Sequence, residues 1–161
     1  MGPDIAHLEV NKGNHMKICL VCSYGGHLSE MLQLMEAFEG HETFFITYDS
    51  ARTRGLERRY LLRNIGTNPL LMAHAFFSIF RILCREKPRL IVSTGSEIAI
   101  PAFYLARILR IKTIFIESWA RVTERSGTGR LVYPVADVFL VQWERLLPKY
   151  GEKAKYEGAV I

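Results

Sequence analysis

The chain has 161 residues, of which 49% are hydrophobic and 23% charged, enough apolar material for one buried core and too much for a wholly disordered protein. Its formal charge of +5 favours acidic partners such as phosphates, nucleic acid or anionic membrane surfaces, and the sign of the charge alone does not choose among them. No segment reaches the roughly 20 apolar residues of a membrane-spanning helix, so any membrane contact is expected to be peripheral. We expect residues 1–15 to be a tag-like or disordered leader before a single domain at 16–161.

The first predicted element is a buried strand at 18–22, which leads through a glycine loop into a helix at 28–38. Gly25 and Gly26 let the backbone approach a ligand, and free amides at the helix start favour a negative group. His27 either caps the helix or serves as a general base. The loop departs from G-x-G-x-x-G and from the P-loop, so a plain tight turn stays open as an alternative.

Three cysteines are present, and Cys19 and Cys22 have the C-x-x-C spacing of redox and metal sites. Positions three apart on a strand point to opposite faces, which favours free thiols in the core instead. The sequence has only three aspartates and no D-x-D or His/Cys cluster, so no metal or other cofactor is expected.

A second strand at 42–48 is followed by Asp49, the place where a dinucleotide fold puts its ribose acceptor. A stand-alone Rossmann enzyme that binds a dinucleotide is therefore one alternative. The competing explanation is ordinary turn chemistry, because aspartate is common just after a strand.

The segment 52–63 is rich in arginine, and its side chains are either a solvated face or a landing site for diphosphate. Arg52, Arg58 and Arg59 are the candidates for the second role. A nucleic-acid groove would add stacking aromatics, and only Tyr60 is interleaved here, so no nucleic-acid partner is expected.

A long helix is predicted at 70–86, apolar nearly all round except for one polar stripe. Such a helix lies either in a bilayer surface or buried against the sheet. A non-catalytic membrane scaffold is thus a further alternative class. The candidate membrane contacts are Phe76, Phe77, Phe80 and Arg81.

Strands and helices continue to alternate, which predicts an α/β fold, a single Rossmann-like domain with a parallel sheet. Ligands in such folds collect beyond the carboxyl ends of the strands. Glu117, at the end of one buried strand, either pairs with Arg121 or serves in the site, by binding an acceptor hydroxyl or by abstracting a proton. The later predicted elements are a strand at 90–93, a turn at 94–96, a helix to 109, and strands at 113–116 and 138–141; the cleft loops are 23–27, 49–54, 94–97 and 117–121.

Over residues 16–161 the chain resembles the membrane-recruiting subunit of two-part glycosyltransferases of lipid-linked oligosaccharide synthesis, the asparagine-linked glycosylation (ALG) fourteen homologues and bacterial counterparts such as PssD. Single-chain relatives such as MurG have a similar glycine and histidine loop. The residues that carry this resemblance are Gly25, Gly26 and His27; Glu117, Ser118 and Arg121; Leu131, Tyr133, Pro134, Ala136 and Asp137; and the runs 141–144 and 156–158.

The resemblance implies the N-terminal, acceptor-binding half of an inverting GT-B enzyme, located peripherally at the cytoplasmic face of the membrane. Its substrate would be a polyprenyl-diphosphate-linked saccharide, and a separate partner chain would bind the UDP-sugar donor. Eukaryotic members generally begin with a membrane-spanning segment, and its absence here favours a prokaryotic polysaccharide pathway. The implied residues are His27 and Glu117 for catalysis; Ser23, Gly25, Gly26, Arg52, Arg58, Arg59, Thr94, Gly95, Ser96 and Arg121 for the acceptor; and Tyr156, Gly158, Val160 and Ile161 for the partner.

Overall fold

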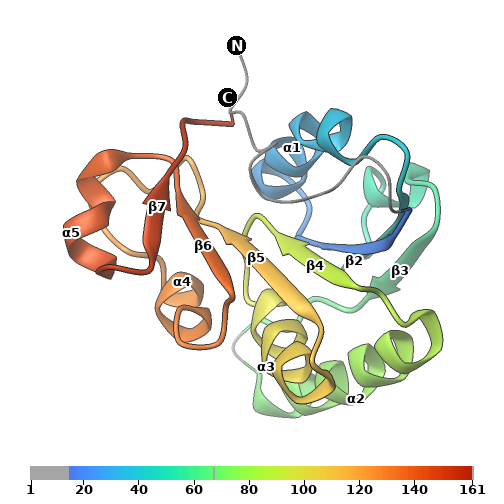
Figure 1. Ribbon diagram of the computed structural model, residues 1–161. Helices are drawn as coiled ribbons and strands as arrows, with labels where there is room; N and C mark the ends of the chain where they lie inside the picture. The colour runs from blue at the N-terminus through green and yellow to red at the C-terminus, as the bar shows by residue number, and fades with distance from the viewer. Residues whose placement is uncertain (1–14, 67, 161) are drawn as a thin grey trace.

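The computed structural model describes residues 15–66 and 68–160, which form one seven-stranded sheet with three-layer α/β architecture (Figure 1). All neighbouring strands are parallel, in the order β3-β2-β1-β4-β5-β6-β7, so the predicted parallel sheet is confirmed. The strands are β1 Lys17–Val21, β2 Glu42–Tyr48, β3 Arg59–Leu62, β4 Leu90–Ser93, β5 Lys112–Ile116, β6 Val138–Val141 and β7 Ala154–Tyr156.

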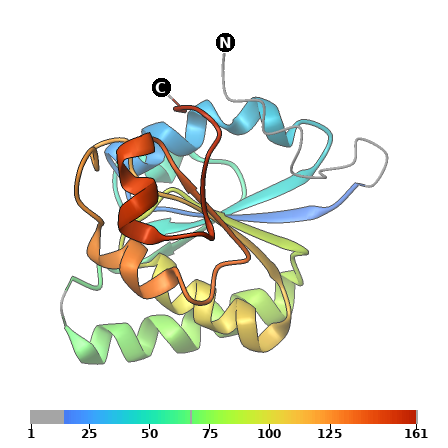
Figure 2. The same cartoon turned by 60° about the vertical axis from the view of Figure 1, so that its left-hand side comes forward.

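Helices cover both faces of this sheet, with α1 on one face and α2, α3 and α4 on the other (Figure 2). The predicted helix at 28–38 begins earlier and breaks at Leu34 into a 3-10 turn. The strand predicted at 138–141 is β6, whereas α4, η4, α5 and β7, of three to six residues each, were not predicted. The helices are α1 Gly26–Gln33, α2 Pro69–Glu86, α3 Ala99–Leu109, α4 Gly127–Val132 and α5 Leu147–Tyr150, with 3-10 turns η2 Met35–Phe38, η3 Thr53–Gly55 and η4 Glu144–Leu146.

Helix α2 has clear start and stop signals in the sequence. The Asn68 side chain accepts hydrogen bonds from the amides of Leu70 and Leu71, with Pro69 in the first turn. Lys87 ends the helix in the left-handed conformation. Among the described residues, no helix combines the length and the hydropathy that crossing a bilayer requires.

The alternating side chains of β1 divide the core into two clusters, one on each face of the sheet. Cys19 and Val21 pack with α2 and α3, whereas Ile18, Leu20 and Cys22 pack with α1. Cys19 and Cys22 are therefore separated by the sheet, and both are free thiols. The prediction that the C-x-x-C spacing gives opposite faces is confirmed.

Only one of the three thiols is expected to react in the native protein. Burial raises the pKa of the Cys22 thiol to about 12 and that of Cys19 well above its usual range, whereas Cys84 is exposed. Because the thiolate is the nucleophile, iodoacetamide at mildly alkaline pH should modify Cys84 alone. Mass spectrometry of the intact and digested protein checks this, and rapid double alkylation of a folded sample would contradict it.

The strand order places a natural ligand site at the carboxyl edge of the sheet. From β1 the chain moves outward to β2 and β3, then returns to β4 on the other side of β1. The loops after β1 and β4 therefore diverge to opposite faces and leave a crevice between them. Gly25 to His27 and Thr94 to Ser96 belong to these two loops.

Candidate functional site

The glycine loop after β1 leaves the start of α1 open. Gly25 precedes the helix with φ +80°, a conformation that suits glycine, and no described side chain caps this end. His27 lies inside the first turn and does not cap the helix, which excludes the capping role considered from the sequence. The amides of this turn are thus available to an anionic group.

His27 is held to the loop after β4 by two hydrogen bonds. Its Nδ1 lies 2.8 Å from the carbonyl oxygen of Thr94, and the Thr94 hydroxyl donates back to the His27 carbonyl at 2.7 Å. A carbonyl oxygen only accepts, so Nδ1 carries the proton and Nε2 keeps a lone pair in the neutral ring. That tautomer is the one a general base needs.

Gly95 gives the His27 ring its space. Its φ is +119°, and a Cβ atom added there would lie 2.7 Å from Cε1 of His27. The next residue, Ser96, also has a positive φ, and its hydroxyl donates to Glu97, which accepts from Tyr48 as well. The loop after β4 therefore leaves space for the His27 ring and contacts β2 through the hydrogen bond between Glu97 and Tyr48.

Arg52 adds a positive charge beside the glycine loop. Its Nη1 lies 3.0 Å from Ser29 Oγ and 3.4 Å from the carbonyl oxygen of Gly25, so the loop after β2 joins the cleft as predicted. Asp49 is occupied by Arg54, which donates to both carboxylate oxygens at 2.7 and 2.9 Å and lowers the Asp49 pKa. The geometry thus favours turn chemistry over a ribose acceptor at Asp49.

Arg58 and Arg59 do not join this cleft, contrary to the prediction. The segment that contains them returns along the sheet and forms β3, whose first residue is Arg59. Arg58 therefore lies near the amino ends of the strands, where it pairs with Glu42 and Glu86. The Arg59 guanidinium donates to the carbonyl of Leu56.

Glu117 is a buried carboxylate whose oxygens accept several hydrogen bonds from nearby donors. It is 1% exposed and accepts hydrogen bonds from the amide of Ser118, from the amide and hydroxyl of Ser126, and from the hydroxyl of Tyr150. No ion pair with Arg121 forms among the described residues. This geometry supports a bracing role for the loop 118–126 and leaves His27 as the better candidate base.

Gly129 leaves space for the hydrogen bond between Tyr150 and Glu117. A Cβ atom there would lie 2.1 Å from the Tyr150 hydroxyl and 2.5 Å from Glu117 Oε2. Burial, together with the hydrogen bond to Glu117, raises the Tyr150 pKa, so the phenol stays protonated as a donor. Any side chain at position 129 would therefore prevent these contacts, which explains why a glycine stands there.

Sequence reasoning missed a second buried carboxylate, Glu30. It is 4% exposed and accepts from Ser118 Oγ at 2.9 Å, from the Trp119 amide at 3.2 Å and from Gln142 Nε2 at 2.7 Å. Gln142 also accepts from the amide of Val160 at 2.8 Å. One network therefore joins α1, the loop after β5, the end of β6 and the chain toward the C-terminus. The only local signal was that Glu30 lies between the apolar residues of α1.

The remaining predicted cleft and partner residues lie at the same carboxyl edge. Ser23 is in the glycine loop, and Arg121 is exposed on the loop after β5. Beside it, the Trp119 and Trp143 rings lie in contact, tilted by 42° with their centroids 5.7 Å apart. Tyr156 is exposed at the end of β7, followed by Gly158 and Val160, while Ile161 lies outside the described residues.

Helix α2 buries one face against the sheet, as one of the two alternatives predicted, and exposes two aromatic side chains elsewhere. Ala75, Ile79, Ile82 and Leu83 are buried against the sheet, whereas Phe77 and Phe80 are 61% and 41% exposed. The Arg81 guanidinium lies over the Phe77 ring. Phe76 is half-buried and packs on the core, so it leaves the predicted membrane-contact set.

Comparison with known proteins assigns the sequence to a family. The family model described as "Oligosaccharide biosynthesis protein Alg14 like" matches residues 51–160. The UDP-N-acetylglucosamine transferase subunit ALG14 of Yarrowia lipolytica is 26% identical over 181 residues, covering 93% of this chain and 83% of that protein. Its Homo sapiens counterpart is 29% identical over 189 residues, covering 96% and 87%.

Solved structures with the same fold are about twice as long as this chain. Acinetobacter baumannii MurG superposes with a TM-score of 0.76 at 17% identity, covering 89% of this chain and 45% of that one. For the UDP-GlcNAc 2-epimerase of Methanocaldococcus jannaschii the TM-score is 0.68 at 16% identity, covering 88% and 45%. The fold of this chain thus matches the N-terminal, Rossmann-like half of MurG, which has the GT-B fold.

Proposed function

The chain belongs to the Alg14-like family of oligosaccharide biosynthesis proteins, and we propose that it is the acceptor-binding subunit of a two-chain inverting glycosyltransferase. Relatives named as UDP-N-acetylglucosamine transferase subunits support a glycosyltransferase role. The acceptor is a saccharide linked to polyprenyl diphosphate, and the donor is a UDP-sugar bound mainly by a partner chain. The complex works at the cytoplasmic face of the membrane, to which this subunit binds peripherally.

The observation that carries this proposal is the position of His27. Its Nδ1 is held by Thr94, so Nε2 is the basic atom, and it sits at the switch point of a parallel sheet beside an open helix start. In the reaction, Nε2 takes the proton of the acceptor hydroxyl. The hydroxyl oxygen then bonds to the anomeric carbon from the face opposite UDP, the bond to UDP breaks, and the anomeric configuration inverts.

The acceptor diphosphate binds beside this histidine. The amides at Gly25 and Gly26 and the Arg52 guanidinium provide hydrogen bonds and positive charge there. Ser23, the loop from Thr94 to Ser96, and Arg121 form the remaining wall of the acceptor site. Arg58 and Arg59 have no part in it, because they lie near the amino ends of the strands.

The partner chain closes the cleft from the carboxyl edge. Tyr156, Gly158 and Val160 are its proposed contacts, and the network through Gln142 connects them to α1. Sites between domains commonly hold ligands, and here the second wall belongs to another polypeptide.

Reconstitution tests the proposal. The purified chain alone is expected to transfer no labelled sugar from a UDP-sugar to a polyprenyl-diphosphate saccharide, whereas addition of the partner restores transfer. The partner alone is the control, since it lacks the acceptor half. Robust transfer by this chain by itself would overturn the two-chain assignment.

A further inference from the structure

Glu30 on α1 is a buried acidic residue for which the proposed mechanism has no role. Its side chain is 4% exposed, and among the described residues no lysine or arginine forms an ion pair with it. Three neutral donors contact it instead, namely the Ser118 hydroxyl, the Trp119 amide and the side-chain amide of Gln142. A carboxylate buried without a cation costs free energy unless its oxygens are hydrogen-bonded, so its position depends on these contacts.

Glu30 attaches α1 to the sheet one turn after His27. The two residues are three positions apart and therefore lie on the same side of the helix. His27 contacts the loop after β4, whereas Glu30 contacts the loop after β5 and the end of β6, and these three strands are neighbours in the sheet. The helix has only eight residues. Its direction, and with it the place of the His27 ring, therefore depends on both contacts.

Gln142 connects Glu30 to the chain beyond β7. Its side chain is 2% exposed; Nε2 donates to Glu30 and also to the carbonyl oxygen of Glu117 at 3.0 Å, and Oε1 accepts from the Val160 amide at 2.8 Å. A flipped amide group would exchange the donor and the acceptor and break all of these bonds. Val160 is thus linked to α1 through two hydrogen bonds in series.

Packing alone does not require a charge at position 30. Leu28 and Met31 already bury α1 against the sheet. Replacing buried ionic groups with apolar side chains of similar volume is often neutral or stabilising, so stability is a weak reason for this carboxylate. Hydrogen bonds depend on direction, unlike apolar contacts, so a carboxylate at this place fixes how α1 lies.

We propose that Glu30 and Gln142 are positioning residues that couple the docking of the partner chain on residues 156–160 to the binding of the acceptor at α1. A partner that fixes Val160 also fixes Gln142, which holds Glu30 and the helix that carries His27. Because linkage is reciprocal, a bound acceptor tightens partner binding by the same factor by which the partner tightens acceptor binding. The inference rests on the proposed function for the identity of the partner and the acceptor.

Hydrogen exchange of the full chain, without a partner, tests the link by a double-mutant cycle. Val160→Pro removes the amide that donates to Gln142 and should speed exchange of the α1 amides roughly threefold or more, but less than about twofold in a Glu30→Leu background, where the link is already broken. If Glu30→Leu fails to fold, Gln142→Leu breaks the same link from its other side. Ala159→Pro is the control for the proline, since the Ala159 amide donates no hydrogen bond within the described part of the chain.

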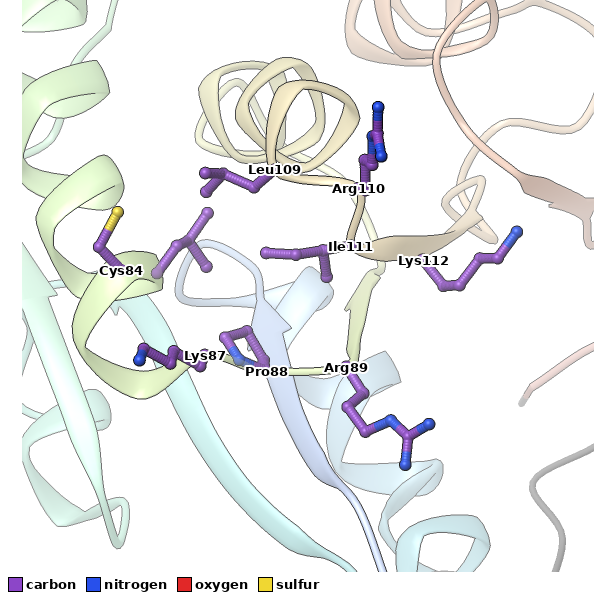
Figure 3. A pocket seen from close by; sticks show the side chains of 9 residues that line it. Cys84, Lys87, Pro88, Arg89, Leu109, Arg110, Ile111 and Lys112 are labelled. Atoms are coloured by element: carbon purple, nitrogen blue, oxygen red, sulfur yellow. The ribbon is translucent and has the colours of Figure 1, made fainter.

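Thr113→Val is the control for loss of a buried polar group. Thr113 is 1% exposed, and its hydroxyl donates to Asp137 Oδ2 at 3.2 Å and accepts from the Asp137 amide at 2.9 Å. It follows Lys112 at the amino end of β5, beside the hollow in Figure 3, and so lies at the other end of this strand from Ser118. This variant should leave exchange of α1, and the effect of Val160→Pro on it, unchanged.

In the reconstituted complex, the coupling is measured as partner affinity with and without a polyprenyl-diphosphate saccharide. The acceptor should tighten partner binding about fivefold or more for the wild type and less than twofold for Glu30→Leu. Glu30→Gln should retain most of the effect, because the Ser118 hydroxyl can turn to accept from the new amide. A purely structural role would lower the active fraction of the protein and leave the coupling factor unchanged.

Three results would overturn the inference. The first is an equal effect of Val160→Pro in both backgrounds, and the second is an acceptor effect on partner affinity that survives Glu30→Leu. The third is an equal loss for leucine and glutamine at position 30, which would assign the role of Glu30 to its charge. Absence of sugar transfer by the wild-type complex would instead overturn the proposed function, whereas the exchange cycle uses neither partner nor sugar and still decides whether Val160 is linked to α1.

Discussion

Replacing His27 with alanine is expected to lower turnover of the assembled enzyme by roughly 100-fold or more, because the proton acceptor for the attacking hydroxyl is lost. The geometry makes this substitution informative. Thr94 holds the ring through Nδ1, and Gly95 leaves it room, so Nε2 has no hydrogen-bond partner among the residues that the structure describes. The measurement is single-turnover transfer by the complex at saturating donor and acceptor.

Two controls separate the chemistry of His27 from its packing. His74→Ala removes an exposed imidazole from α2 and should leave turnover near wild type. Binding of the partner and the melting temperature of the His27 variant should change little, because the ring is only half-buried. A turnover close to wild type for His27→Ala would exclude this residue as the base.

Glu117→Ala is expected to act on stability, with a loss of about 2–4 kcal/mol in the free energy of unfolding. The carboxylate accepts from the backbone and hydroxyl of Ser126 and from Tyr150, and its removal leaves these donors without a partner in the interior. For a chain of this size the melting temperature should fall by roughly 5–15 °C. Thermal and urea unfolding of the isolated chain measure both quantities.

Glu124→Ala is the matched control for this prediction. Glu124 lies in the same loop, its side chain is 69% exposed, and its contact with Lys149 is 3.8 Å long, so the cost should stay within about 0.5 kcal/mol. If Glu117→Ala instead kept full stability and abolished transfer, the carboxylate would be acting in catalysis and the bracing role would be wrong.

Local pattern was sufficient for the main layout of this protein. Near-continuous apolar runs separated by helical periods predict a parallel sheet, and chain order alone brings the loop of Gly25 to His27 to its carboxyl edge. The opposite faces of Cys19 and Cys22 follow from the two-residue period of a strand. These features depend on near neighbours in the sequence, so the sequence is enough to predict them.

Tertiary contacts decided the roles of the charged residues. The sequence predicted Arg58 and Arg59 in the cleft, but β3 begins at Arg59, so both residues lie near the amino ends of the strands. Strand β3 has only four residues, too few for a hydrophobic pattern that predicts a strand. Glu117 resembled an available base, yet its donors come from Ser126 and from Tyr150, 33 residues away. Glu30 meets Gln142 across 112 residues of chain. Hydrogen-bond partners this distant are selected by how the elements pack, and no local periodicity encodes them.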